Sequence, residues 1–225
     1  MAWNRPNAFR LFVCAGLALS IAGGMNVRAA DGETREFAIL VDGKPAGTAN
    51  MTIEKKDDGS TVVACDTNVT VRVLIKKYVY TCQTREVWKD GRLQQLSSRC
   101  NDDGKQYEVS GAAQADGVRV RVNGRERTVK PEVWLSSYWT LPDPKIRAGV
   151  VPVLDSDNGR DLQVRIQHIG EAQIAVAGQM QNVHHYRLTG TVGAELYYDA
   201  SGRLVRREWV EEGHPTVMEL TRLRR

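Results

Sequence analysis

Hydrophobic and polar residues alternate with a period of two along most of the chain. The pattern is clearest at Phe37–Val41, Val69–Val73, Val118–Val122 and Leu162–Ile166. Such alternation is typical of β-strands with one buried and one solvated face. Asp-Gly and Asn-Gly pairs such as Asp90-Gly91 separate these stretches and predict short turns between antiparallel neighbours. The pattern therefore predicts an all-β fold, an antiparallel meander of about a dozen strands curled into a barrel or half-barrel.

One segment, Pro131–Pro144, departs from this alternation. Its large side chains stand at i,i+4 spacing, Trp134 with Tyr138 and Leu135 with Trp139, after a proline suited to a first helical turn. It predicts one short helical or aromatic segment that plugs or covers the sheet. Three roles are open for it: filling the core at an open end of the barrel, a lid that contacts a ligand, and a tip that touches a membrane.

The N-terminus has the features of a secretory signal peptide. Two arginines precede the apolar run Leu11–Met25, and Val27-Arg28-Ala29 supplies small residues for cleavage. The run of about 15 residues is shorter than the roughly 20 that a membrane-spanning helix needs. We expect a signal peptide at residues 1–29 and one β-rich domain at 30–225, exported to the periplasm or secreted, with no transmembrane span after cleavage. An uncleaved signal that acts as an anchor is the alternative.

The charge balance bears on the class of partner. The chain holds 31 Lys and Arg against 27 Asp and Glu, but three of the arginines lie in the expected signal peptide. The remaining chain is therefore almost neutral. Nucleic-acid binding needs a clustered excess of positive charge, and the sequence has no such excess.

Three cysteines remain after residue 29. If Lys89 pairs with Leu93 across a three-residue loop, Cys82 lies directly opposite Cys100. Directly opposed residues of antiparallel strands are close enough for a disulfide. This register predicts a Cys82–Cys100 disulfide and a free Cys65. The alternative is that all three cysteines are small buried hydrophobic residues, because a change of turn type would shift the register.

The search for catalytic motifs gives little. The sequence has no Gly-x-Ser-x-Gly, no phosphate-binding glycine loop and no His-Glu-x-x-His. His184 and His185 are adjacent and would point to opposite faces of a strand. Asp155–Gly159 resembles a calcium loop but lacks the closing glutamate, so we interpret it as a turn. No catalytic residue, metal ligand or cofactor is predicted, and enzymatic activity is the least favoured reading.

Three stretches carry a family resemblance: Glu86–Leu93, Tyr138-Trp139 and Tyr198–Val205. They resemble an uncharacterised exported bacterial family, the domain of unknown function 6134, over about Thr34–Arg222. The resemblance implies one β-rich domain without an assigned activity. The layout is also similar to the curved half-barrels of periplasmic lipoprotein carriers, although none of their ligand-binding residues can be matched onto this chain.

The sequence therefore favours a binding module for a lipid or other hydrophobic molecule in the cell envelope. The candidate lining residues are the large aromatics Trp88, Trp134, Tyr138, Trp139 and Trp209. A structural or interaction protein of the envelope, with a filled core and no ligand, is the alternative, and an enzyme of unrecognised type is a third. Packing of the interior distinguishes the first two, because a core at native density leaves no space for a ligand.

Overall fold

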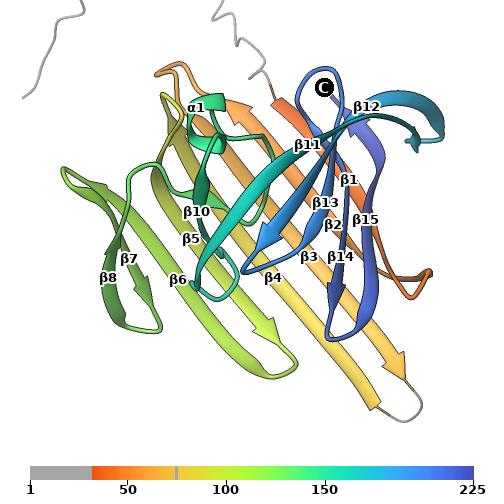
Figure 1. Ribbon diagram of the computed structural model, residues 1–225. Coiled ribbons are helices and arrows are strands. Elements are labelled where there is room, and N and C mark those ends of the chain that lie inside the picture. Colours follow the sequence, from red (N-terminus) through yellow and green to blue (C-terminus); the bar gives the residue numbers. More distant parts are fainter. Residues whose placement is uncertain (1–31, 74–75) are drawn as a thin grey trace, which may run out of the picture.

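The computed structural model describes residues 32–73 and 76–225, so the expected signal peptide lies outside the described residues. The described strands form one fifteen-stranded sheet (Figure 1). They are β1 (Gly32–Val41), β2 (Lys44–Lys55), β3 (Thr61–Val73), β4 (Lys76–Lys89), β5 (Arg92–Asp102), β6 (Lys105–Gln114), β7 (Gly117–Val122), β8 (Arg125–Val129), β9 (Trp134–Leu135), β10 (Val150–Leu154), β11 (Asp161–Val176), β12 (Gln179–Gly190), β13 (Ala194–Tyr198), β14 (Leu204–Glu211) and β15 (His214–Arg224), with one short helix, α1 (Pro144–Arg147). The predicted all-β meander is confirmed, with more strands than expected.

The sheet curls but does not close. Its strand order runs from β8 back to β1, across to β15, and back to β9. All neighbours are antiparallel except β9 and β10, which are parallel. The two ends of the sheet come together through side chains instead of strand pairing: Arg127 of β8 donates hydrogen bonds to the Asp161 carboxylate at 2.7 Å and to the carbonyl of Gly159 at 2.5 Å. The result is a barrel-like sheet with an inner and an outer face.

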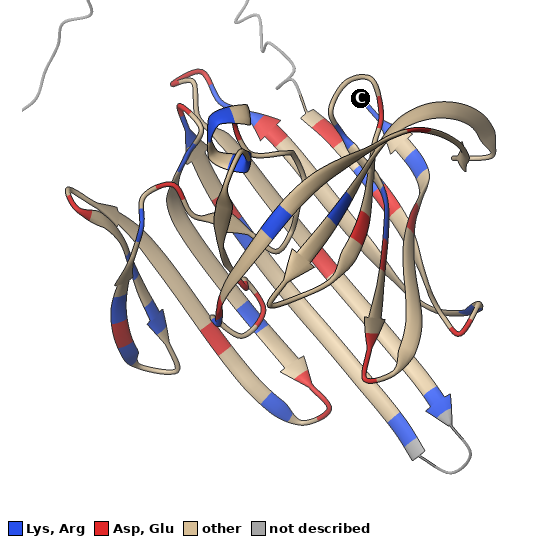
Figure 2. Ribbon diagram, viewed as in Figure 1, with Lys and Arg blue, Asp and Glu red and all other residues tan. Residues whose placement is uncertain are grey.

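The inner face carries the core. Period-two alternation places Val63, Ile39, Leu96 and Leu196 inward, and each is at most 4% exposed. The apolar side chains gather in three clusters: one under β10–β14, one under β1–β3 and β15, and one between β5–β7 and β9–β10. Most of the charged residues are exposed, and in Figure 2 basic and acidic residues are interspersed along the strands and turns.

The segment at 131–144 is the aromatic plug, and of the two forms expected for it, helical or aromatic, it does not adopt the helical one. Trp134 and Leu135 pair with β10 as β9, and Tyr138 has a φ of 48°, in the left-handed region that interrupts a helix. Helix α1 begins only at Pro144. The plug spreads its side chains over the whole core, because Trp134 and Tyr138 join the first cluster, Leu135 the third and Trp139 the second. Tertiary packing overrides the helical spacing here.

The hairpin between β4 and β5 corrects one detail of the sequence analysis. Its turn has two residues, both with positive φ, and Lys89 pairs with Arg92, one residue earlier than predicted. A bulge at Gln94 then adds the missing residue. The two differences cancel, so Cys82 still lies opposite Cys100.

In the described part of the chain, no helix has the length and hydrophobicity that crossing a membrane requires.

Candidate functional site

A carboxyl group lies at the centre of the inner face. Glu86 shares the inward register of Cys82 on β4 and is 0% exposed. The indole N–H of Trp88 donates to Glu86 Oε2 at 2.7 Å, while Glu86 Oε1 has no hydrogen-bond partner. Burial raises the pKa of Glu86 to about 7, and the side chains of Ser137, Trp88 and Trp139 work against that rise. The aromatic plug therefore encloses a carboxyl group that is largely uncharged below neutral pH.

A second carboxyl group reaches the same interior from the turn between β10 and β11. Asp157 Oδ2 accepts a hydrogen bond from the Tyr80 hydroxyl at 2.7 Å, and Oδ1 accepts one from Ser156 at 3.3 Å. Burial, followed by the nearby carboxylate of Asp155, raises the pKa of Asp157 to about 6. The inner face of β4 thus contacts two carboxyl groups that hold their protons more tightly than usual.

The turn that presents Asp157 depends on Gly159. Asp155–Gly159 is a turn, as predicted, closed by a hydrogen bond from the Gly159 amide to the Asp155 carbonyl at 2.8 Å. Gly159 has a φ of 75°, and a Cβ atom there would lie 2.3 Å from Cγ2 of Val122. Only glycine combines this conformation with such a close approach to β7.

An arginine occupies the opposite side of the interior. Arg207 of β14 pairs with Leu196 and Met218 and shares their inward direction. Its guanidinium carbon lies 4.8 Å from the ring centre of Tyr138 and 4.4 Å from that of Trp209. Both distances are within the range of cation–π contacts. Arg207 Nε is buried without a hydrogen-bond partner, and Arg207 forms no ion pair within the described residues.

The neighbouring arginine on the outer face differs. Arg206 contacts Glu208 at 2.6 Å and Glu219 at 2.8 Å. Adjacent arginines of one strand therefore have opposite environments, an acidic one outside and an aromatic one inside.

All five predicted aromatic residues lie in or against the core clusters, in two groups, with Trp134 and Tyr138 buried and Trp88, Trp139 and Trp209 half-buried. Trp88 and Trp139 meet edge to face with ring centres 6.4 Å apart. Trp134 and Tyr138 meet at 4.7 Å, and Trp209 joins that group through Arg207. The sequence analysis missed Glu86, Asp157 and Arg207. Alternation along the strands could have found two of them, because Glu86 lies at the same inward register as Cys82 on β4, and Arg207 at the same register as Trp209 on β14.

The inner face is not sealed along its whole length. Val63 of β3 is 1% exposed, but Val69 and Val71, further along the same face, are only half-buried. Tyr78, which pairs with Val71, and Met218 on β15 are half-buried too. In Figure 1, β3 and β4 extend beyond the neighbouring hairpins at this end. Apolar inner-face side chains are therefore partly open to solvent near the β3–β4 hairpin.

The cysteines lie on the same inner face. Cys82 and Cys100 form the predicted disulfide, and Cys65 is free. Burial raises the pKa of the Cys65 thiol to about 12, which makes it a poor nucleophile. An Asp157 carboxylate oxygen lies within 4.8 Å of both disulfide sulfurs. Because these sulfurs are bonded to each other, they are not thiolate metal ligands in this state.

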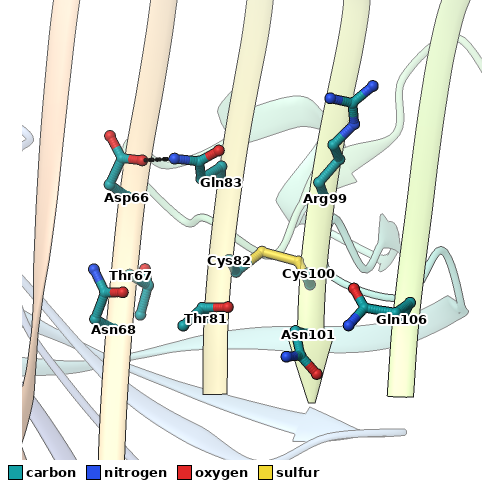
Figure 3. A pocket seen from close by; sticks show the side chains of 10 residues that line it. All are labelled: Asp66, Thr67, Asn68, Thr81, Cys82, Gln83, Arg99, Cys100, Asn101 and Gln106. Carbon is teal, nitrogen blue, oxygen red and sulfur yellow. Dashed lines mark hydrogen bonds between the residues drawn. A yellow bond between two sulfur atoms is a disulfide. The ribbon is translucent and has the colours of Figure 1, made fainter. Parts of the chain in front are cut away.

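The outer face of β3–β6 has a hollow of about 270 Å³ (Figure 3). It is lined by Asp66, Thr67, Asn68, Thr81, Cys82, Gln83, Arg99, Cys100, Asn101 and Gln106. A hydrogen bond of 2.8 Å from Gln83 to Asp66 crosses it. A second polar hollow lies beside it, around Arg85 and Ser97. None of the five predicted aromatics lines either hollow, so these surfaces are separate from the interior site.

A family model decides where this chain belongs. The model for the domain of unknown function DUF6134 matches residues 37–221. The chain is a member of the DUF6134 family. The resemblance seen in the sequence is thereby confirmed.

Solved structures show the same kind of fold. This DUF6134 chain is similar to a β-barrel-like protein of the domain of unknown function DUF1849 from Brucella abortus, known from a crystal structure. The TM-score is 0.57 at 10% sequence identity, over 85% of this chain and 96% of the other. At this identity the likeness concerns the fold alone. No curated protein sequence matches the chain.

Proposed function

We propose that this DUF6134 chain is an exported binding module that holds a lipid or another hydrophobic molecule against the inner face of its open sheet. One observation carries the proposal. Val69, Val71 and Tyr78 lie on the inner face, in register with the buried core, yet they are only half-buried. Covering such side chains with an apolar chain is favourable by roughly 25 cal/mol for each Å² removed from water.

The aromatic plug limits where the ligand lies. Leu135 is 0% exposed and Tyr138 1% exposed, so the part of the interior around β9 and β10 is filled by the chain itself. The ligand occupies the other part, between the described strands β3–β4 and β14–β15, with Met218 and Trp209 on its far side. Barrel-like sheets of this size hold small ligands in this way.

Export is the second element of the proposal. The apolar run Leu11–Met25 with small residues after it supports a signal peptide, and a disulfide is favoured in an oxidising compartment. The similarity of the sequence layout to periplasmic carrier half-barrels supports the same location.

A second candidate function is a structural or interaction protein of the envelope with no ligand. The filled region around the plug favours it. The two candidates differ only in whether the half-buried part of the inner face takes up an apolar molecule.

Titration with the neutral fluorescent probe N-phenyl-1-naphthylamine tests the proposal. The wild-type chain is expected to bind the probe at one site and increase its fluorescence. Val69→Asp, which places a charge on the inner face, should weaken binding by tenfold or more, on the order of the cost of leaving a charge near an apolar ligand. Asn68→Asp is the matched control, because Asn68 precedes Val69 on the same strand and its side chain is exposed on the outer face.

The same titration can reject the proposal. Absence of a probe signal from the correctly folded wild-type chain would favour the ligand-free scaffold. Equal effects of the inner and outer substitutions would show that the probe binds elsewhere.

A further inference from the structure

We infer that the ligand is an anionic amphiphile, whose carboxylate or phosphate head group binds the guanidinium of Arg207 while its apolar chain lies along the inner face. This inference rests on the proposed function and adds the charge and the position of the head group.

The first argument is the missing counter-charge of Arg207. Two other arginines of the interior, Arg35 and Arg203, have acidic partners supplied by the chain. Arg35, 3% exposed, contacts Glu33 at 2.6 Å, and Arg203 contacts Asp199 at 2.7 Å. Arg207 forms no ion pair with any described residue, and its buried Nε donates no hydrogen bond. Arg207 is half-buried with its Nε buried, and since charges withdrawn from water in proteins are normally paired, its partner is expected to come from a ligand.

The second argument is geometric. Tyr138 and Trp209 contact the guanidinium at 4.8 and 4.4 Å from their ring centres. Contacts of this kind do not neutralise a guanidinium and do not pair its N–H groups with an acceptor. A planar fork of donors held in this way is suited to two parallel hydrogen bonds with a carboxylate or phosphate. The aromatic residues therefore orient Arg207 for an oxyanion without neutralising it.

The third argument is the position of Arg207 within the interior. Tyr138 is buried, whereas Trp209 and Met218, which pack against the same cluster, are only half-buried. Across the sheet, Arg207 is in register with Met218, which pairs with Ile39 of β1. The same row continues through β2 to Val69. A head group on Arg207 thus directs an attached chain over the apolar surface that the proposed function requires.

The nearby acidic side chain does not take this role. The charge of Arg207 partly offsets the raised pKa of Asp157, so the two groups sense each other. No Asp157 oxygen lies within 4.0 Å of Arg207, however, and both oxygens already accept hydrogen bonds from Tyr80 and Ser156. The guanidinium remains free for an external anion.

Calorimetric titration with two ligands of equal chain length tests the inference. Decanoate and 1-decanol differ in the charge of the head group, and a slightly alkaline buffer keeps decanoate ionised. The wild-type chain is expected to bind decanoate about tenfold or more tightly than 1-decanol, because a hydrogen bond between two charged groups increases the affinity by about this factor. Arg207→Gln should abolish this preference, so that decanoate binds no more tightly than 1-decanol.

Arg206→Gln is the matched control. It removes an equal charge from the adjacent residue, on the outer face, and should preserve the preference for decanoate. Acetate and inorganic phosphate, which offer a head group without a chain, should bind far more weakly than decanoate.

Each contrary result has a distinct meaning. If the wild-type chain binds neither decanoate nor 1-decanol, the proposed function fails. If it binds both equally, or if Arg206→Gln removes the preference as fully as Arg207→Gln does, the head-group inference fails while the binding module stands. Tight binding of phosphate alone would replace the amphiphile with a small anion.

Discussion

Trp88 donates its indole N–H to the carboxyl of Glu86 over 2.7 Å, two residues back on the same inner face of β4. Among the described residues, the carboxyl of Glu86 accepts no other hydrogen bond of normal length and angle. Glu86 is 0% exposed. A carboxyl group so enclosed is stable as the neutral acid and costly as the anion. The stability of the fold should therefore depend on pH through Glu86.

We expect Glu86→Gln to flatten that dependence. The pKa of Glu86 is about 7 in the folded chain and near the ordinary glutamate value of 4.5 when the chain is unfolded. Between these values the folded chain keeps a proton that the unfolded chain has released, so the free energy of unfolding falls as pH rises through this window. The difference amounts to about 3 kcal/mol. We expect urea unfolding at about pH 8 to give Glu86→Gln a free energy of unfolding up to this amount higher, relative to wild type, than at about pH 4.

Glu171→Gln, at an exposed position of β11, is the control and should follow the wild-type curve. Asp157 also holds a raised pKa, from burial and from Asp155, and it remains in both chains, so it does not produce the difference. Parallel pH profiles for wild type and Glu86→Gln would contradict the account of a buried neutral acid.

The disulfide makes a covalent prediction. Peptide mapping without reductant should join Cys82 to Cys100 and leave Cys65 alkylatable only after unfolding. The cysteines are 18 residues apart, so replacing both with serine should cost about 3 kcal/mol of unfolding free energy. A bridge that includes Cys65 would overturn the strand register of β3–β5.

The turn that carries Asp157 can be tested by a pair of glycines. Gly159 and Gly178 have similar φ values, 75° and 79°, but a Cβ would meet Val122 at 2.3 Å in the first and nothing within 4 Å in the second. Gly178→Ala should cost about 1 kcal/mol from backbone strain alone. Gly159→Ala should cost roughly 1 to 3 kcal/mol more, because the new methyl group overlaps β7. Equal melting temperatures for the two variants would contradict the close packing of this turn.

The aromatic plug should behave as core. Trp134 is 4% exposed, and its indole N–H donates to the Thr140 carbonyl at 3.0 Å. Trp134→Ala is expected to cost about 3 to 5 kcal/mol in chemical denaturation. Val210→Ala, at a position 65% exposed, is the control and should stay within about 0.5 kcal/mol of wild type. A near-neutral Trp134→Ala would mean that the segment is a surface lid.

Much of the fold follows from local patterns. Period-two alternation and turn residues predicted the antiparallel sheet. The predicted pairing of β4 with β5 gave the disulfide, because the turn is one residue shorter than predicted and a bulge in β5 adds one residue back. The plug could not be predicted in the same way. Spacing of i,i+4 is shared by helices and by irregular segments, and only contacts with β10 and the three clusters decide that Tyr138 adopts a left-handed conformation.

The candidate site was predictable in its aromatic part only. Trp88 and Trp209 were predicted from their large aromatic side chains. Glu86 and Arg207 have the same register, but charged residues are expected outside, so their enclosure depends on the curvature of the whole sheet. Asp157 was correctly placed in a turn, and its inward direction is fixed by the packing of Gly159 against Val122.

Native mass spectrometry of the full chain, expressed and exported in a bacterial host and purified without detergent, tests the proposed binding module most directly. The account predicts a chain shortened by its first 29 residues, carrying one non-covalent adduct that passes into organic solvent on extraction and is acidic. The bare mass of the chain, from preparations in which it is folded and its disulfide is intact, would contradict the account and favour the ligand-free scaffold.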